Sequence, residues 1–253
     1  MITIFTVPKA FEGHVGTIQR NAIGSWLRVH PECQVVLCGN DPGVAEVASQ
    51  LGVDHIPDVE VNEYGTPLLD SVFARSASIA RHHLLCYINA DVIARPDLFR
   101  AALEMTFDQF LLVGQRWDVP VTEPIDFANT RWFDELMELT RDRGQLHPPA
   151  GSDYFLFPAH SPLVHLPAFA VGRPAWDNWM IYRAKTLGVP VVDCSEAVLM
   201  IHQNHDYGHV FQSTDGFYNG PEGDRNRELA VGTQALLLCD ADFVLTREGL
   251  RRL

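Results

Sequence analysis

The sequence predicts an α/β fold in which a mixed, mostly parallel sheet is flanked by helices within a single domain. Short apolar runs recur along the first half of the chain, and stretches with apolar residues at helical spacing separate them. This alternation of strand and helix patterns is typical of parallel sheets whose faces are covered by helices. The length of 253 residues and the hydrophobic content of 47% allow one sizeable core.

Four strand patterns and three helix patterns alternate in the first half. The strands are expected at residues 2–7, 34–38, 53–56 and 84–88. The helices are expected where apolar side chains recur at helical spacing, at residues 15–27, 44–51 and 68–80. Pro8 closes the first strand, and Gly52 ends the second helix. The run from Leu84 to Ile88 is apolar throughout, which indicates a strand buried on both faces.

The second half carries weaker signals. Apolar runs predict further strands at residues 110–114, 154–157, 189–193 and 197–201. Helices are expected at residues 96–105, at 132–143 and after Pro174. The stretch 212–226 is rich in Gly, Asp, Asn and Pro, which predicts a surface loop. Because apolar residues return near the end of the chain, residues 211–253 are expected to form a tail that packs on the domain.

The composition excludes several classes of partner. The formal net charge is −13 and the pI is near 5.2, so the surface repels phosphate backbones and nucleic-acid binding is not expected. No apolar run approaches the length of a transmembrane segment. The five cysteines form no C-x-x-C pair, and most lie in or next to apolar runs. They are typical of reduced core thiols, which indicates a cytoplasmic protein.

The best candidate for chemistry is Asp91, which follows the buried strand in the sequence Asn89-Ala90-Asp91. A carboxylate there lies at the carboxyl edge of the sheet, where open α/β sheets bind ligands. Asn and Asp are also ordinary turn residues, and a plain turn is the alternative. The chain has no glycine-rich phosphate-binding motif after its first strand. A nucleotide at this edge would therefore need a divalent cation between a carboxylate and its diphosphate.

A second polar cluster follows the apolar run that ends at Ile201. Three histidines fall within the eight residues from His202 to His209, together with two amides and one carboxylate. Imidazole and carboxylate groups together suit manganese and similar metals. Either His202 or His205 could complete a ligand set begun by Asp91. The alternative is a solvated polar loop.

Asp177 lies between two tryptophans at the start of an expected helix. An acid in a first helical turn is a common cap, but an acid beside aromatic rings is also typical of sugar sites. In such sites the rings cover the apolar face of the sugar and the carboxylate accepts a hydroxyl proton. Asp153 and Tyr154 either bind an acceptor hydroxyl or form only a turn. Arg75 could reach a diphosphate, although an exposed helix charge is the favoured interpretation.

The order of these features resembles the nucleotide-diphospho-sugar transferases of the GT-A fold, over roughly residues 1 to 210. In that family an Asp-x-Asp motif after the fourth strand binds the metal and the diphosphate, and Asn89-Ala90-Asp91 occupies its place. Asp91 keeps the acid that contacts the metal, whereas Asn89 brings no charge and could still bind the ribose. The resemblance makes residues 1–114 a nucleotide-sugar-binding half and residues 115–210 an acceptor and catalytic half.

The resemblance also implies a role for each candidate residue. The donor is expected to contact Thr6, Val7, Pro8, Asn40, Asp41, Arg75, Asn89, Ala90 and Asp91. The acceptor is expected to contact Asp153, Tyr154 and Trp176, with Asp177 as the catalytic base of an inverting reaction. A Mn²⁺ or Mg²⁺ ion is expected on Asp91 and on His205 or His202.

The function implied by the resemblance is a metal-dependent glycosyltransferase. It would move a sugar from a UDP- or GDP-linked donor to a glycan or another hydroxyl acceptor. The alternative, motivated by Asn89, is a non-catalytic domain that binds a sugar nucleotide or a glycan. A nucleotidyltransferase ranks lowest, because residues 8–13 lack the glycine-rich loop with Arg and Lys that is usual in that class.

Overall fold

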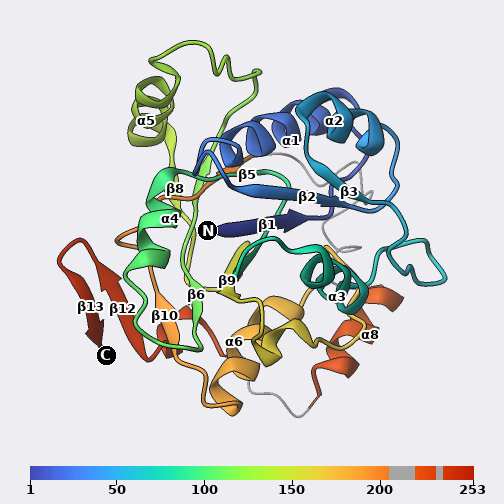
Figure 1. Cartoon of the computed structure of the whole chain (residues 1–253), viewed down its shortest axis with the longest axis vertical. Coiled ribbons are helices and arrows are strands. Elements are labelled where there is room, and N and C mark those ends of the chain that lie inside the picture. Colours follow the sequence, from blue (N-terminus) through green and yellow to red (C-terminus); the bar gives the residue numbers. More distant parts are fainter. Residues whose placement is uncertain (205–219, 232–235) are drawn as a thin grey trace.

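The fold is built on one large mixed sheet, with β1 near the centre of the molecule (Figure 1). The computed structural model describes residues 1–204, 220–231 and 236–253. Across the sheet the strands lie in the order β13-β12-β10-β6-β9-β4-β1-β2-β3. Their bounds are β1 Ile2–Thr6, β2 Gln34–Cys38, β3 Asp54–Ile56, β4 Leu84–Ile88, β6 Leu111–Val113, β9 Tyr154–Pro158, β10 Val191–Asp193, β12 Phe243–Thr246 and β13 Gly249–Arg252.

The strand pairing confirms the predicted mixed, mostly parallel sheet. β4, β1, β2 and β3 pair in parallel, and so do β6, β10 and β12. β9 is antiparallel to both of its neighbours, and β13 is antiparallel to β12. Every residue of β4 is buried, as expected for a strand that is covered on both faces.

Helices cover both faces of the sheet and enclose two apolar cores (Figure 1). α1, α2 and α4 contribute residues such as Trp26, Val47 and Leu98 to one core. α3 and α6 contribute residues such as Phe73 and Met180 to the other. The helix bounds are α1 Gly13–Trp26, α2 Val44–Leu51, α3 Leu69–Ile79, α4 Pro96–Leu103, α5 Trp132–Arg143, α6 Trp176–Thr186 and α8 Pro221–Leu229, with short 3-10 helices at η1 Pro162–Val164 and η3 Leu238–Asp240.

A second, smaller sheet brings His202 next to the turn that carries Asp91. Its strands lie in the order β5-β11-β7-β8, with bounds β5 Val92–Ile93, β11 Ile201–Gln203, β7 Trp117–Val119 and β8 Gln145–Leu146. In its register His202 lies opposite Val92 on one side and Asp118 on the other. A small apolar cluster that includes Leu136 of α5 packs against this sheet.

Some expectations about the second half were wrong. The run 197–201 is a strand only from Ile201, because a turn in which Cys194 O accepts two backbone hydrogen bonds precedes it. Residues 221–226 belong to α8 and not to a loop, whereas residues 212–219 lie outside the described residues. α8 has few apolar residues, so its sequence signals are Pro221 and the acids that follow. The short strands β7 and β8 have no counterpart in the sequence prediction.

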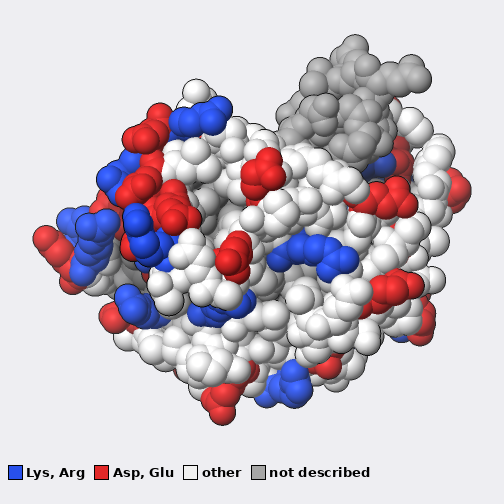
Figure 2. Space-filling model, turned by 90° about the horizontal axis from the view of Figure 1, so that it is seen from above, with Lys and Arg blue, Asp and Glu red and all other residues white. Residues whose placement is uncertain are grey.

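Charged side chains of both signs share the surface (Figure 2). On the face shown there, Lys and Arg lie among Asp and Glu, and no continuous basic stripe crosses the described residues. A phosphate backbone would meet repulsion as well as attraction on this face. Within the same described ranges, no helix is both long enough and apolar enough to cross a bilayer.

Asn226 provides a test of how α8 holds the segment that precedes α6. Its fully buried amide accepts a hydrogen bond from Ala170 N at 2.9 Å and donates to Ala170 O and Pro174 O at 3.1 and 3.3 Å. Asn226→Ala leaves these backbone groups without partners, so we expect the free energy of unfolding to fall by about 2–3 kcal/mol in urea titrations. Glu228→Ala, at an exposed position of the same helix, is the control. Equal midpoints for the two variants would contradict this role.

Candidate active site

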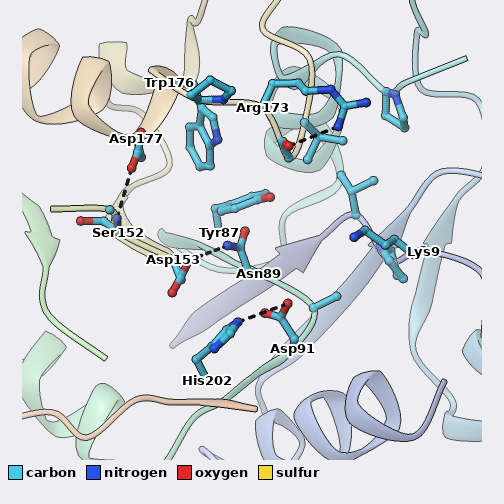
Figure 3. A pocket seen from close by; sticks show the side chains of 18 of the residues that line it. Lys9, Tyr87, Asn89, Asp91, Ser152, Asp153, Arg173, Trp176, Asp177 and His202 are labelled. Atoms are coloured by element: carbon cyan, nitrogen blue, oxygen red, sulfur yellow. Dashed lines mark hydrogen bonds and ion pairs between the residues drawn. The ribbon is translucent and has the colours of Figure 1, made fainter. Parts of the chain in front are cut away.

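A cavity of about 760 Å³ opens at the carboxyl ends of β1 and β4. Four segments supply most of its lining: residues 7–9 after β1, 89–91 after β4, 150–153 before β9 and 171–178 at the start of α6. His202, from β11, also lines it (Figure 3). Open α/β sheets bind their ligands at this edge.

Asp91 and His202 point toward one another in this cavity (Figure 3). The distance between Asp91 Oδ2 and His202 Nε2 is 3.8 Å. The other ring nitrogen of His202, Nδ1, lies 3.1 Å from Asp118 Oδ1. Burial alone would lower the pKa of His202, but the carboxylates of Asp91 and Asp118 raise it above its ordinary value. The imidazole is therefore held between two acids.

Asp118 is the centre of a polar network beneath the cavity. Besides His202, its carboxylate contacts Arg116 Nε at 3.0 Å and His147 Nδ1 at 2.7 Å. Burial would raise the pKa of Asp118, but the hydrogen bonds from His202, His147 and Arg116 hold it well below its usual range. Asp118 is therefore ionised, and it fixes two imidazole rings and one guanidinium group in place.

The amide of Asn89 has a partner that explains why no acid stands at this position. Asn89 Nδ2 donates to Asp153 Oδ1 at 2.7 Å. Asp153 Oδ2 also forms a short ion pair with Arg116. An aspartate at position 89 would set two carboxylates against each other at hydrogen-bond distance. Asp153 thus lies next to Asn89, but its charge is offset by the ion pair with Arg116.

Asp177 enters the cavity from the first turn of α6. Ala175 caps this helix with a φ of 86°, a left-handed conformation that residues with a Cβ seldom adopt. Ser152 N donates to Asp177 Oδ2 at 3.3 Å. Burial raises the pKa of Asp177, and hydrogen bonds from the backbone of Asn178 and Ser152 offset this only in part. A carboxylate with a raised pKa is a stronger base than an exposed aspartate.

Trp176 lines the same cavity but packs mainly against other rings. Its ring centroid lies 5.1 Å from that of Tyr87 and 5.1 Å from that of Phe155. Only 5% of the residue is exposed, so it offers a small part of its ring to a ligand.

Lys9 and Arg173 bring positive charge to the cavity (Figure 3). Lys9 is exposed at its entrance, yet desolvation by the surrounding walls lowers the pKa of its ammonium group, which Asp91 and Asp41 partly oppose. Arg173 forms an ion pair with Glu222 of α8. Burial would raise the pKa of Glu222, but hydrogen bonds from groups that include Arg173 hold it below its ordinary value.

Most residues that the sequence singled out line this one cavity. They are Val7, Pro8, Asp41, Asn89, Ala90, Asp91, Asp153, Trp176, Asp177 and His202. Four further candidates do not line it, namely Thr6, Asn40, Arg75 and Tyr154. His205 lies outside the described residues.

The four residues outside the lining each have a different environment. Thr6 is fully buried at the end of β1, and Asn40 is exposed in the turn after β2. Arg75 lies on α3 and is 3.6 Å from Asp58. Tyr154 is fully buried, with its hydroxyl 3.3 Å from Cys194 Sγ, because alternate residues of a strand face opposite sides of the sheet.

Sequence reasoning missed several residues that build the site. They are Lys9, Arg116, Asp118 and His147. Arg116 and Asp118 come shortly after the apolar run at residues 110–114. Charged residues just after an expected strand are a usable signal for a site. His147 lies in a stretch without periodicity, and no sequence pattern indicates it.

No group of three or more His, Cys, Asp or Glu side chains in a metal-binding arrangement occurs among the residues that the structure describes. Among those residues, Asp91 and His202 are therefore two predicted metal ligands without a third. The remaining predicted ligand, His205, falls outside them.

Comparison with solved structures shows that the chain has the GT-A fold, which is the fold of nucleotide-diphospho-sugar transferases. No protein-family model matches the sequence, and no curated protein matches it either. At the low identities of these structural matches, the similarity shows the fold alone.

Three of the similar structures cover nearly the whole chain. GalNAc-T7 with UDP, GalNAc and Mn²⁺ aligns at a TM-score of 0.57 and 13% identity, covering 91% of this chain and 48% of that one. M. tuberculosis glucosyl-3-phosphoglycerate synthase aligns at 0.51 and 14% identity, covering 91% and 79%. S. aureus TarS 1–349 with UDP-GlcNAc aligns at 0.50 and 12% identity, covering 90% and 70%. The alignment with GalNAc-T7 thus spans less than half of that chain. In a separate structure of TarS 1–349, solved with UDP, the aligned part is 36% of that chain.

Asn89→Asp tests the pairing between Asn89 and Asp153. The new carboxylate faces that of Asp153, and we expect the free energy of unfolding at pH 7 to fall by about 1–3 kcal/mol. The loss should shrink on acidification, because repulsion raises the pKa of one of the two acids and protonation removes its charge. Urea titrations at pH 7 and pH 5 measure both effects, with Asn40→Asp in an exposed turn as the control. A loss that is the same at both pH values would contradict the pairing.

Proposed function

We propose that this protein is a metal-dependent glycosyltransferase that moves a sugar from a nucleotide-diphosphate donor to a hydroxyl acceptor. The observation that carries the proposal is Asp91 facing His202, 3.8 Å apart, in the cavity at the end of β4 of a GT-A fold. Asp177, a carboxylate with a raised pKa, lines the same cavity. Two side chains that can bind a metal and one that can act as a base thus lie at one edge of the sheet. Metal-dependent transfer of a sugar to a hydroxyl group uses both.

The donor set fits a divalent cation such as Mn²⁺ or Mg²⁺. Asp91 offers a carboxylate oxygen and His202 an imidazole nitrogen, a combination that suits manganese. The contact from Asp118 to the other nitrogen of His202 is the outer-shell arrangement that orients a metal-binding imidazole. His205 stays a predicted third ligand. When bound, the cation would stabilise the charge that develops on the leaving diphosphate.

The donor would lie between the segments that follow β1 and β4. Val7, Pro8 and Asp41 form the wall expected to face the base and ribose, and Lys9 adds a positive charge for the diphosphate. The GalNAc-T7 and TarS structures were obtained with UDP and UDP-GlcNAc, respectively. UDP-linked sugars are therefore the first donors to test, with GDP-linked sugars second.

Asp177 would take the proton of the acceptor hydroxyl. The freed oxygen then attacks the anomeric carbon, and the bond from that carbon to the diphosphate breaks with its electron pair on the diphosphate. Attack from the side opposite the leaving group inverts the anomeric centre. The raised pKa of Asp177 makes it a better proton acceptor near neutral pH than an ordinary aspartate.

Asn89 favours a second candidate function, a domain that binds a sugar nucleotide or glycan without transfer. The charge missing at Asn89 is not restored, because the carboxylate of Asp153 is paired with Arg116. Such a domain would bind a donor but release no nucleotide from it.

Thermal unfolding against a panel of UDP- and GDP-linked sugars, with and without MnCl₂, tests the donor site. A ligand at 100 times its dissociation constant stabilises the folded state by about 2.7 kcal/mol, so a bound donor should raise the melting temperature visibly. We expect one donor to do so only with metal, and Asp91→Asn to abolish the shift. Asp142→Asn, on the exposed side of α5, is the matched control. A flat panel for the wild type would contradict the proposal.

Nucleotide release from the stabilising donor separates the two candidate functions. We expect Asp177→Asn to keep the donor-induced thermal shift but to lower turnover at least 100-fold, because general-base catalysis contributes typically 10²–10⁴-fold. Binding by the wild type without release of nucleotide, across a broad panel of acceptors, would instead support the binding domain.

A further inference from the structure

His147 is a cavity residue whose backbone is held by two hydrogen bonds and whose ring is held by one. Its backbone N donates to Arg116 O at 2.9 Å, and its carbonyl accepts from Gln115 Nε2 at 2.7 Å. Its ring nitrogen Nδ1 lies 2.7 Å from Asp118 Oδ2. A ring oriented in this way in a ligand cavity loses less conformational freedom on meeting a substrate than an unbonded one.

The contact with Asp118 decides which nitrogen of His147 faces outward as an acceptor. An ionised carboxylate only accepts hydrogen bonds, so Nδ1 must carry the proton. In the neutral ring Nε2 then presents a lone pair. No residue that the structure describes forms a hydrogen bond with this Nε2.

Gly151 opens a gap between His147 and Asp177. The φ of Gly151 is +85°, which favours glycine. A Cβ built on this residue would lie 3.7 Å from His147 Nε2 and 3.9 Å from Asp177 Oδ2. The space above Gly151 is thus flanked by two hydrogen-bond acceptors, an imidazole nitrogen and a carboxylate oxygen. An atom of a ligand in that space would be near both.

We infer that His147 and Asp177 form an acceptor subsite over Gly151 that binds two neighbouring hydroxyl groups of a sugar or another polyol. The inference rests on the proposed function. His147 Nε2 and Asp177 Oδ2 both accept hydrogen bonds, so a ligand satisfies both only if it brings two hydrogen-bond donors. A simple alcohol satisfies one of them, and a carboxylate or phosphate group would set its own acceptors against both.

The two residues have different roles in this subsite. Asp177 takes the proton from the hydroxyl that attacks the anomeric carbon, as described above. His147 Nε2 accepts a hydrogen bond from the neighbouring hydroxyl and keeps the acceptor aligned. Loss of His147 should therefore raise the KM for the acceptor more than it lowers kcat, whereas loss of Asp177 acts on kcat.

UDP release from UDP-glucose and UDP-GlcNAc with MnCl₂ provides the test. The acceptor probes are the methyl α-glycosides of glucose, galactose and mannose, with 1-propanol at equal concentration as the single-hydroxyl probe. We expect at least one glycoside to raise UDP release above hydrolysis in water, and propanol not to. His147→Asn keeps a donor toward Asp118 but removes Nε2, and it should raise the KM for that glycoside about tenfold, the effect of one hydrogen bond.

Two further measurements make the outcome decisive. His160→Asn, in the exposed turn after β9, is the matched control and should behave as the wild type. In ¹⁵N-resolved spectra of the wild type with UDP and Mg²⁺, the Nε2 resonance of His147 should shift when the active glycoside is added. Equal stimulation by propanol and the glycosides, or an unchanged KM in His147→Asn, overturns the subsite and leaves the transferase proposal standing. Absence of both donor binding and UDP release overturns the two together.

Discussion

The carboxylate of Asp118 is the group on which the polar site depends. It accepts hydrogen bonds from Arg116 and His147, and His202 Nδ1 lies 3.1 Å from it. Arg116 directly precedes β7, His147 directly follows β8, and His202 lies in β11. The Asp118 side chain is only 25% exposed, and a carboxylate with so little access to water is costly unless cationic or donor groups surround it, as these three do. Arg116, His147 and His202 all line the cavity, so one ionised side chain helps to orient both the part beside Asp91 and the part beside Gly151.

The small sheet sets His202 opposite Asp118. Its strands are two or three residues long, too short to be stable alone, and they are held by the apolar cluster under α5. The register that sets His202 opposite Asp118 also sets it opposite Val92, one residue beyond Asp91. A slip of one residue would turn His202 away from both acids. The precision of the site therefore comes from backbone pairing, and the large sheet supplies only the platform.

The parts that the sequence predicted well are those with a long, regular pattern. The apolar run of β4 indicated a buried strand, and that alone located Asp91 at the correct edge of the sheet. Asp118 and His147 escaped prediction because β7 and β8 are too short to show periodicity, and their meeting depends on tertiary pairing. Tyr154, which the sequence suggested as an acceptor contact, does not line the cavity. Alternate residues of a strand face opposite sides of the sheet, and Tyr154 packs into one core while Phe155 packs into the other.

The bonds made by α8 have a consequence for the order in which the protein is assembled. Glu222 accepts a hydrogen bond from Asn62, 160 positions earlier in the chain, and Asn226 bonds to Ala170, 56 positions earlier. Contacts between such distant positions form late, because the chain must close long loops first. During synthesis from the N-terminus, the large sheet can begin to form before α8 has been made. The rim of the cavity near Arg173 is then completed only when α8 has been made, so a chain that ends before α8 lacks the ion pair between Arg173 and Glu222.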